Sequence, residues 1–402
     1  MGFDKGRLQR IAPAMQAYVD RGVYAGVSVL VAQGGEVAYS GEFGHRDREA
    51  KTPMTEDAIF RLYSMTKPIV CTALMTLVEE AKIRLFDPVA AYIPAFAAVQ
   101  VLGADGKLVP AKQLMTVRDL MMHTSGLSYG FLEDSPVCRD YARSKLMLAR
   151  VPLSEAIEDL ARLPLAFQPG ERYHYSVGID VAARLIEIVS GKTLGRFLEE
   201  RLFAPLKMPD TAFVVPEAKR GRLATMYGRP DLTQPGVTTQ TAFELWRTTG
   251  YNQRIDVEAS YPVDAPGVFE RGGHGLFGTT SDYFRFAQML CNGGALDGVR
   301  VIGRKTLELM HSNHLPLSLL PFEIGGLPLP GYGFGLGSRV LLDVASSGAP
   351  GSVGEYGWSG AAKTHFWVDP REQVVALFMT QSMLSFDLPE LDLRALVYQA
   401  LE

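Results

Sequence analysis

The sequence predicts an α+β fold, in which an antiparallel sheet combines both chain ends and carries a mainly helical insertion. Strand-like runs at 27–32 and 37–40 flank the turn at 33–35, and runs at 364–368 and 374–380 flank residues 369–372. Short turns rich in Gly, Asp and Pro between such runs are typical of hairpins, whose strands pair antiparallel. The middle of the chain instead shows helical spacing interrupted by Pro and Gly.

Helices are expected at both ends of the chain and throughout its middle. Apolar residues at helical spacing predict a first helix over 5–20 and a closing helix over 389–401. The same pattern predicts helices over residues 70–82, 117–123, 153–163, 179–189, 194–202 and 276–290. Gly191 is a plausible stop for one of them, because glycine accepts the left-handed conformation of a helix C-cap. Residues 208–270 and 310–357 show no assignable pattern.

Composition describes an ordinary globular protein and excludes several kinds of partner. The chain has 402 residues, of which 47% are hydrophobic and 21% charged, with a net charge of −4. Because the sequence has no basic stripe, we expect no nucleic-acid partner, and no apolar run is long enough to predict a membrane span. The three cysteines are odd in number and far apart, and the N-terminus has no apolar signal core. These features predict free thiols and a cytoplasmic location.

The pair Ser64 and Lys67 is the first candidate for chemistry. Residues three apart share one face of a helix, so an amine at Lys67 can remove the proton from the Ser64 hydroxyl and activate it as a nucleophile. Pro68 lacks an N–H and fits the first turn of a helix that starts near Ser64. That start also places the hydroxyl at the positive end of the helix dipole. By itself, Ser-x-x-Lys is short enough to arise by chance.

Two further segments give the pair a chemical context. Tyr175 carries a phenol that, held against an amine, can relay a proton to a leaving group. The segment 356–361 precedes the C-terminal hairpin and is rich in small residues, so a substrate could approach its backbone closely. A free N–H there, opposite that of Ser64, would form an oxyanion hole. Taken singly, these segments would also fit a packed tyrosine and a glycine-rich bulge.

These three segments, in this order, make the chain resemble the serine β-lactamase/penicillin-binding-protein superfamily. The closer resemblance is to class C β-lactamases and to family VIII carboxylesterases. Blocks that look like this family span most of the chain, at 60–67, 120–127, 169–176, 275–283, 292–294 and 366–370. The resemblance implies the class C β-lactamase-like fold. It also implies one catalytic unit of two lobes, an α/β lobe from 1–62 plus 285–402 and a mainly helical lobe from 63–284, with the active site between them.

Two departures from the lactamase pattern favour ester substrates. Class C lactamases carry Tyr-x-Asn, whereas the third position here is Val177. They also carry Lys-Thr-Gly on the last strand, where this chain has Trp358-Ser359-Gly360, which resembles the W-x-G of the esterases. The nearby Lys363-Thr364-His365 lies three residues too late and is read as a coincidence. Both anchors for an anionic β-lactam are therefore missing, while the acyl-transfer residues remain.

The resemblance implies a serine carboxylesterase that hydrolyses short-chain esters through an acyl-enzyme on Ser64. Lys67 and Tyr175 share the acid/base roles, and the backbone N–H groups of Ser64 and Ala361 hold the oxyanion. The residues expected to contact substrate are Trp358, Ser359, Gly360, Val177 and His274. No cofactor or metal is expected. The expected partner is a small-molecule ester, and the sequence does not predict the oligomeric state.

Other readings of the sequence remain open. The rivals on the same scaffold are a β-lactamase, a D-amino peptidase or another amide hydrolase, and a penicillin-binding-type sensor without catalysis. The stretch Gly126-Leu127-Ser128-Tyr129-Gly130 spells the G-x-S-x-G of a nucleophile elbow, which needs a strand before the serine and a helix after it. Here a helix is expected before Ser128 and a loop after it. We therefore interpret Ser128 as a turn residue, and His123 as the end of the helix before it.

Overall fold

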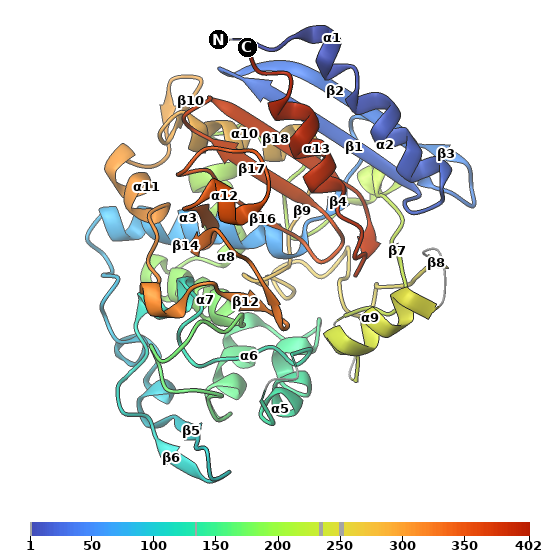
Figure 1. Ribbon diagram of the computed structural model, residues 1–402. Coiled ribbons are helices and arrows are strands. Elements are labelled where there is room, and N and C mark those ends of the chain that lie inside the picture. Colours follow the sequence, from blue (N-terminus) through green and yellow to red (C-terminus); the bar gives the residue numbers. More distant parts are fainter. Residues whose placement is uncertain (1, 133–134, 233–235, 249–252) are drawn as a thin grey trace.

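The computed structural model describes residues 2–132, 135–232, 236–248 and 253–402 (Figure 1). Within these residues, eight strands form one antiparallel sheet. In spatial order, the strands are β14 (Tyr332–Phe334), β15 (Arg339–Leu341), β16 (Tyr356–Ser359), β17 (His365–Asp369), β18 (Val374–Met379), β1 (Gly26–Gln33), β2 (Glu36–Asp47) and β3 (Thr52–Pro53). The predicted α+β fold with both terminal hairpins in one sheet is confirmed.

The centre of the sheet joins the two ends of the chain. β1 pairs antiparallel with β18, with Ser28 opposite Met379 and Gln33 opposite Val374. All but the last residue of β1 are buried, which indicates that both faces of the sheet are covered. Val27, Val29 and Val31 point to one face and Leu30 and Ala32 to the other, as the period of two along a strand requires.

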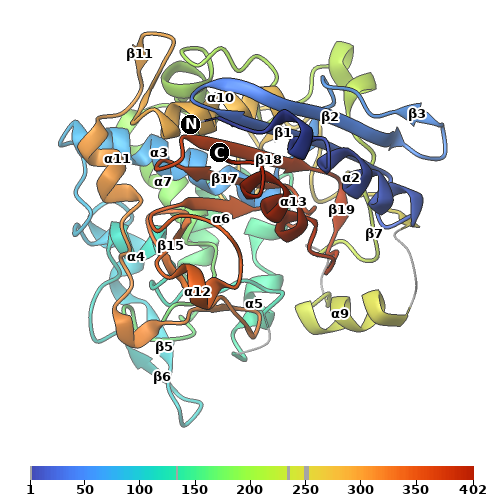
Figure 2. The same cartoon turned by 45° about the horizontal axis from the view of Figure 1, so that its top comes forward.

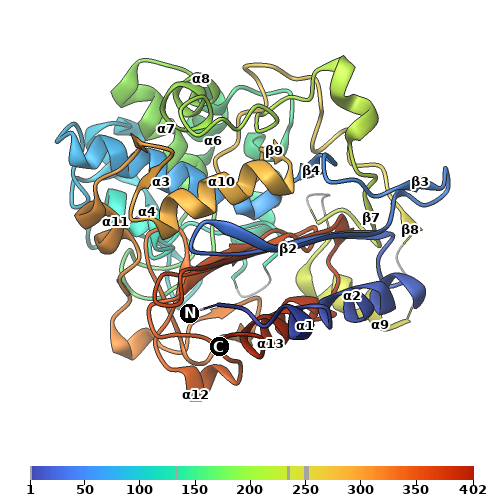
Figure 3. The same cartoon turned by 90° about the horizontal axis from the view of Figure 1, so that it is seen from above.

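Helices cover both faces of this sheet. The helices are α1 (Lys5–Leu8), α2 (Ile11–Asp20), α3 (Thr66–Glu79), α4 (Val117–Met121), α5 (Cys138–Ala142), α6 (Leu153–Leu160), α7 (Gly178–Ser190), α8 (Leu194–Leu198), α9 (Thr239–Thr248), α10 (Thr280–Cys291), α11 (Arg304–Met310), α12 (Val344–Ser347) and α13 (Pro389–Tyr398). Seen from above, α1, α2 and α13 lie on one side of the sheet and α3 and α10 on the other (Figure 3). In Figure 2, α2 and α13 lie in front of the central strands.

Short strands also pair outside the main sheet. They are β4 (Phe60–Arg61) with β9 (Phe277–Gly278), β5 (Gln100–Leu102) with β6 (Leu108–Pro110), β10 (Ala295–Leu296) with β11 (Val299–Arg300), β12 (Glu323–Ile324) with β13 (Leu327–Pro328), and β7 (Tyr227–Gly228) between β8 (Gln253–Arg254) and β19 (Ser382–Met383). The β4–β9 pair fixes the chain immediately before Ser64. The unassigned segment 208–270 therefore contributes β7, β8 and α9 to the structure.

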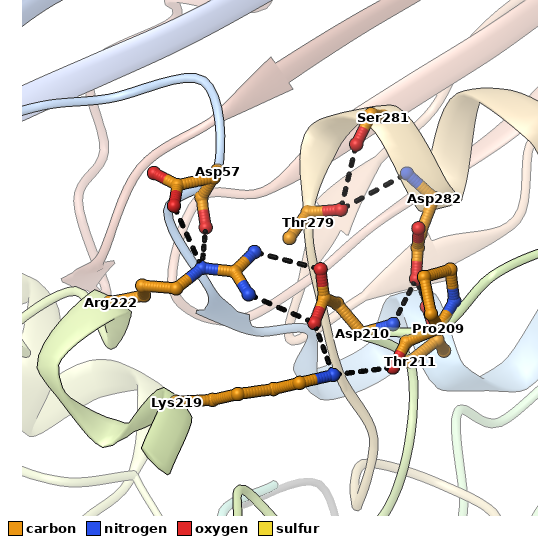
Figure 4. A network of polar contacts seen from close by, with 9 residues as sticks. All are labelled: Asp57, Pro209, Asp210, Thr211, Lys219, Arg222, Thr279, Ser281 and Asp282. Atoms are coloured by element: carbon orange, nitrogen blue, oxygen red, sulfur yellow. Dashed lines mark hydrogen bonds and ion pairs between the residues drawn. The ribbon is translucent and has the colours of Figure 1, made fainter.

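A polar network fixes the start of α10 against this insertion (Figure 4). The Thr279 side chain caps the helix by accepting from the N–H of Asp282. The Asp282 carboxylate accepts from the Asp210 N–H at 2.8 Å and from the Thr211 hydroxyl at 2.9 Å. Asp210 in turn receives two hydrogen bonds from Arg222, of 2.7 and 3.0 Å. A bidentate arginine of this kind fixes direction as well as distance.

Two helix starts differ from the sequence prediction. The helix expected over 276–290 begins only at Thr280, because Phe277 and Gly278 pair with β4 and Thr279 is the N-cap. The helix expected near Ser64 begins at Thr66, after a single 3-10 turn over Tyr63–Met65. The predicted stop at Gly191 is confirmed, with a left-handed φ of 70° at the C-cap. The boundary at residue 285 falls inside α10, and the division into two lobes stays a proposal.

No helix in the described ranges combines the length and the apolar character that a membrane span would need.

Candidate active site

Ser64 lies in the 3-10 turn that leads into α3. The residue before it, Tyr63, has a positive φ of 47°, a backbone conformation that is strained for a bulky side chain. Lys67 lies in the first turn of α3, three residues after Ser64, and its Nζ is 2.9 Å from Ser64 Oγ. The structure therefore brings this pair into hydrogen-bond contact, as the spacing predicts.

Lys67 is held on more than one side. Its side chain is 1% exposed, and Nζ donates a second hydrogen bond to the carbonyl of Gly273 at 2.7 Å. Nζ also lies 4.8 Å from the ring centroid of Tyr175 and 5.2 Å from that of Tyr129. Aromatic faces attract a cation at such distances, so the surroundings favour one position of the amine.

Tyr175 reaches the same serine from the segment just before α7. Its hydroxyl donates to Ser64 Oγ at 2.8 Å. Its ring packs against Tyr129, His123 and Trp358, with centroid separations of 5.3, 4.7 and 5.7 Å. Ser64 Oγ thus contacts an amine and a phenol together, which is an arrangement suited to proton transfer from a nucleophile.

Two backbone N–H groups border the same space. Among the described residues, the N–H groups of Ser64 and Ala361 make no hydrogen bond. Ala361 follows β16, and Gly360 allows this strand end to approach the serine turn. A Cβ at Gly360 would lie only 2.4 Å from the Leu62 carbonyl oxygen. Thr364 also donates to that carbonyl at 3.2 Å, which anchors the strand end beside Ser64.

A cavity of about 270 Å³ opens over Ser64 and has mainly apolar walls. The residues bordering it are Tyr63, Ser64, Tyr129, Phe131, Met147, Tyr175, Leu232, Thr239, His274, Ile324, Leu329, Arg339, Trp358, Ser359, Ala361 and Leu384. Of the residues expected to contact substrate, Trp358, Ser359 and His274 border this cavity. Val177 does not, because it is buried at the N-cap of α7, where its N–H donates to the Ser128 carbonyl at 3.3 Å. Gly360 does not either, because it packs against the backbone of Leu62.

The Ser359 hydroxyl is hydrogen-bonded to the ring of His365. Alternation along β16 sends the side chains of Trp358 and Ser359 to opposite faces of the sheet. Ser359 Oγ lies 2.7 Å from His365 Nδ1, and His365 Nε2 lies 3.2 Å from Arg339 Nη2. Arginine can only donate, so Nε2 accepts and Nδ1 carries the proton that binds Ser359. These contacts hold the end of β16 on the face of the sheet opposite to the Trp358 side chain.

Sequence reasoning missed two buried groups near Lys67. Tyr129 lies inside the G-x-S-x-G stretch, directly after Ser128. Burial raises the pKa of its phenol well above the usual value, and Asp180 and Tyr175 raise it further. Asp180, at 0% exposure, accepts from the Gly273 N–H at 2.9 Å. Burial raises the pKa of Asp180, against the opposing effects of that N–H and of the positive charge of Lys67.

His274 forms part of the cavity wall, and its side chain carries no charge. Burial, with the nearby positive charges of Lys67 and Arg271, lowers the pKa of its imidazole to about 3. Its ring packs edge-on against Phe269 and Tyr261. The imidazole is therefore uncharged at neutral pH and presents a mainly apolar surface.

Ser128 lies outside the cavity. It follows α4 rather than a strand, and its buried hydroxyl lies 2.8 Å from His174 Nε2 and 3.1 Å from Cys138 Sγ. The nucleophile-elbow geometry is absent at this position. His123 directly follows the C-cap of α4 with a positive φ of 57°, in line with its predicted place at the helix end.

Across the described ranges, no three His, Cys, Asp or Glu side chains gather closely enough to hold a metal ion. His311 instead stacks on Tyr356 with ring centroids 3.5 Å apart, and His314 Nε2 lies 2.8 Å from the Leu309 carbonyl oxygen.

The chain is similar to known proteins over nearly its whole length. It matches the beta-lactamase family over residues 11–400. It is 34% identical to Protein Rv1367c of Mycobacterium tuberculosis, covering 90% of this chain and 87% of that protein. It is 31% identical to Esterase EstB of Burkholderia gladioli, covering 89% and 86%.

A solved structure has the same architecture. EstCE1, described as a hydrolase with promiscuous acyltransferase activity, superposes with a TM-score of 0.80 at 26% identity, covering 98% of this chain and 99% of that one. A family VIII carboxylesterase superposes with a TM-score of 0.74 at 21% identity and supports the fold alone. The family match and the arrangement of residues around Ser64 agree: this chain is a serine hydrolase that belongs to the beta-lactamase family.

Proposed function

We propose that this protein is a carboxylesterase that hydrolyses short-chain esters through an acyl-enzyme on Ser64. The observation that carries the proposal is the contact of Ser64 Oγ with Lys67 Nζ at 2.9 Å and with the Tyr175 hydroxyl at 2.8 Å. The Lys67 amine can take a proton from a nucleophile when it is uncharged, and the Tyr175 phenol can do so when it is deprotonated. No other serine hydroxyl among the residues bordering the cavity has these two neighbours.

In the proposed acylation step, Ser64 Oγ attacks the ester carbonyl while its proton passes to the Lys67–Tyr175 pair. The pair then returns a proton to the leaving alcohol through Tyr175, and the carbon–oxygen bond of the ester breaks. In deacylation, water attacks the acyl carbon and gives a proton to the pair. The bond from the acyl carbon to Ser64 Oγ then breaks, and the pair returns the proton to Oγ, which releases the acid and restores the Ser64 hydroxyl. Both groups contact Ser64 Oγ, so either can take the proton first.

The backbone N–H groups of Ser64 and Ala361 are the proposed oxyanion hole. Both are unengaged within the described chain and border one cavity. Preorganised donors of this kind contribute about 2.7–4 kcal/mol each to transition-state stabilisation in comparable sites. Their position beside Ser64 Oγ supports acyl transfer in general, to water or to another acceptor.

The cavity supports a small acyl substrate. Its volume of about 270 Å³ lies just below the roughly 300–1,000 Å³ typical of sites for drug-sized ligands. Trp358 forms part of an aromatic wall, and the stretch Trp358-Ser359-Gly360 resembles the W-x-G of the esterases. Esterase EstB and EstCE1, both named for hydrolytic activity, support esters over lactams as the main substrates.

The test compares p-nitrophenyl acetate, butyrate and decanoate as substrates for the wild type, Ser64→Ala and Ser128→Ala. We expect butyrate to be hydrolysed faster than decanoate, Ser64→Ala to fall to the uncatalysed rate, and Ser128→Ala to keep its activity. Activity retained in Ser64→Ala would refute the assignment. Nitrocefin turnover equal to ester turnover would favour the rival β-lactamase or amide hydrolase.

We also propose a cytoplasmic location. Cys71 and Cys291 are free and buried, as expected for a chain that folds in a reducing compartment. Cell fractionation with an antibody against the protein tests this, and recovery in an exported fraction would overturn it.

A further inference from the structure

The carboxyl group of Asp180 is buried near Lys67, and Gly273 contacts both side chains. Asp180 is the third residue of α7, in the helix that begins three residues after Tyr175, and it is fully buried. Its Oδ1 accepts from the Gly273 N–H at 2.9 Å, while Oδ2 has no hydrogen-bond partner among the described residues. Burying a carboxyl with an unsatisfied oxygen is costly, and such groups gather at functional sites.

Gly273 connects this carboxyl group to the lysine. Its N–H donates to Asp180, and its own carbonyl accepts the hydrogen bond from Lys67 Nζ at 2.7 Å. Lys67 has three N–H donors, and two of them are used on Ser64 Oγ and the Gly273 carbonyl. The position of Gly273 therefore sets where the amine lies relative to the serine.

The segment around Gly273 is fitted closely to the start of α7. A Cβ at Gly272 would lie 2.4 Å from the Ile179 carbonyl oxygen, and one at Gly273 would lie 2.5 Å from Asp180 Oδ2. Arg271 fixes the other side by donating to the carbonyls of Leu146, Leu148 and Val151. The glycines let the loop backbone approach the carboxyl group directly.

We infer that Asp180 is a positioning residue, whose hydrogen bond to Gly273 holds the carbonyl that aims Lys67 at Ser64. The segment 175–180 then supplies both a catalytic phenol and the support of the catalytic amine from one helix start. The inference rests on the proposed function, since it concerns the activation of Ser64. It requires only the acceptor oxygen of residue 180, and it predicts that an amide oxygen can replace the carboxylate.

The experiment compares Asp180→Leu, which removes the acceptor, with Asp180→Asn, which retains an oxygen for Gly273. Two readouts are used: kcat and KM for p-nitrophenyl butyrate, and the rate at which a fluorophosphonate labels Ser64. We expect Asp180→Leu to lose about 10²-fold in kcat and in labelling rate, with KM within threefold, because small misplacements of a catalytic group cost about that much. Asp180→Asn should stay within fivefold of the wild type.

The matched control is Asp282, another buried acid that accepts a backbone N–H, but from Asp210 at the start of α10. Asp282→Leu should lower thermal stability and leave kcat of the folded fraction unchanged. If Asp180→Leu does not fold, Gly273→Ala gives the second test. The crowding of its Cβ against Asp180 should lower kcat and the labelling rate without changing KM.

Each outcome separates the two proposals. Equal kcat in folded Asp180→Leu and the wild type, or equal losses in Asp180→Leu and Asp180→Asn, would overturn the positioning role and leave the esterase proposal intact. A wild type that labels at Ser64 but hydrolyses no ester would overturn the proposed substrate class, and the labelling rates would still test Asp180. A wild type that neither labels nor hydrolyses would overturn both.

Discussion

The Ser64 hydroxyl receives hydrogen bonds from two groups that differ in charge and in origin. Lys67 comes from the same helix start, so the local sequence fixes its distance to Ser64. Tyr175 comes from more than a hundred residues further along the chain and depends on the packing of α7 against α3. Both groups bond the same oxygen. A variant that lacks one of them therefore keeps the other as a base, but it loses the sharing of the proton between the two.

At this scale, the phenol of Tyr175 can be tested apart from its ring. We predict that Tyr175→Phe lowers kcat/KM for p-nitrophenyl butyrate by about 10²–10⁴-fold, the usual contribution of a positioned acid or base. Tyr173→Phe is the matched control, because the buried Tyr173 hydroxyl has no partner among the described residues. Steady-state kinetics of the two variants provide the measurement. Comparable losses in both would show that ring packing, and not the hydroxyl, supports catalysis.

The candidate site shows which residues a sequence can reveal. Ser64 and Lys67 are close in sequence, so spacing alone places them together. Tyr129 and Asp180 carry no local signal, since their approach to Lys67 depends on tertiary packing and, for Asp180, on a backbone carbonyl. The sequence position of Val177 predicts contact with the substrate, but its side chain is buried at the start of α7.

At the scale of elements, the site depends on how closely the end of β16 approaches the turn before α3. Gly360 packs on the Leu62 carbonyl, and Thr364 donates to the same oxygen. The strand end and the serine turn therefore form one rigid support for the two proposed oxyanion donors. His365 contacts the Ser359 hydroxyl at the same strand end.

We predict that Gly360→Ala abolishes most ester hydrolysis without unfolding the protein. The new Cβ would lie 2.3 Å from Thr364 Oγ1 and 2.4 Å from the Leu62 carbonyl oxygen, so the strand end must move away from Ser64. A loss of about 10²-fold in kcat is expected from a displacement on the order of 1 Å. Gly221→Ala is the control, because a Cβ there meets no atom within 4 Å. Kinetics and circular dichroism are measured for both variants, and an unchanged kcat in Gly360→Ala would show that the close approach of β16 to Ser64 is not needed.

Elements with regular local patterns were predictable, and those defined by distant partners were not. The terminal hairpins have strong turn signals, and β1, β2, β17 and β18 form as expected. The start of α10 was placed too early, because Phe277 and Gly278 are drawn into pairing with β4, which sequence periodicity does not reveal. Segment 208–270 contributes β7, which pairs with the distant β19. Segment 310–357 contributes β12 with β13 and β14 with β15, which pair locally but are only two or three residues long.

At the scale of the whole molecule, stability depends on several histidines that are buried in the neutral form. His311 stacks on Tyr356, and its Nδ1 donates to the Leu307 carbonyl while Nε2 has no partner among the described residues. Burial lowers the pKa of His311 to about 3, despite the opposing effect of that carbonyl. Protonation would place an unsatisfied charged N–H inside the core.

This predicts the direction of the response to acid. The pKa of His311 is lower in the folded chain than the roughly 6.5 of an exposed histidine, so the unfolded chain binds more protons between those values. The stabilisation is present above pH 6.5 and is lost as the pH falls toward 3. We expect His311→Gln to show a smaller decrease in Tm between pH 7 and pH 4 than the wild type. Thermal scans across that range measure it, and parallel curves would contradict this role for His311.

The central claim is that Ser64 is the nucleophile, and covalent labelling tests it most directly. The wild type, treated with a fluorophosphonate and digested, is analysed by mass spectrometry to locate the modified residue. We expect stoichiometric labelling on Ser64 and none on Ser128, with labelling abolished in Ser64→Ala and strongly slowed in Lys67→Met. Labelling at Ser128, or undiminished labelling of the Ser64→Ala variant, would contradict this claim.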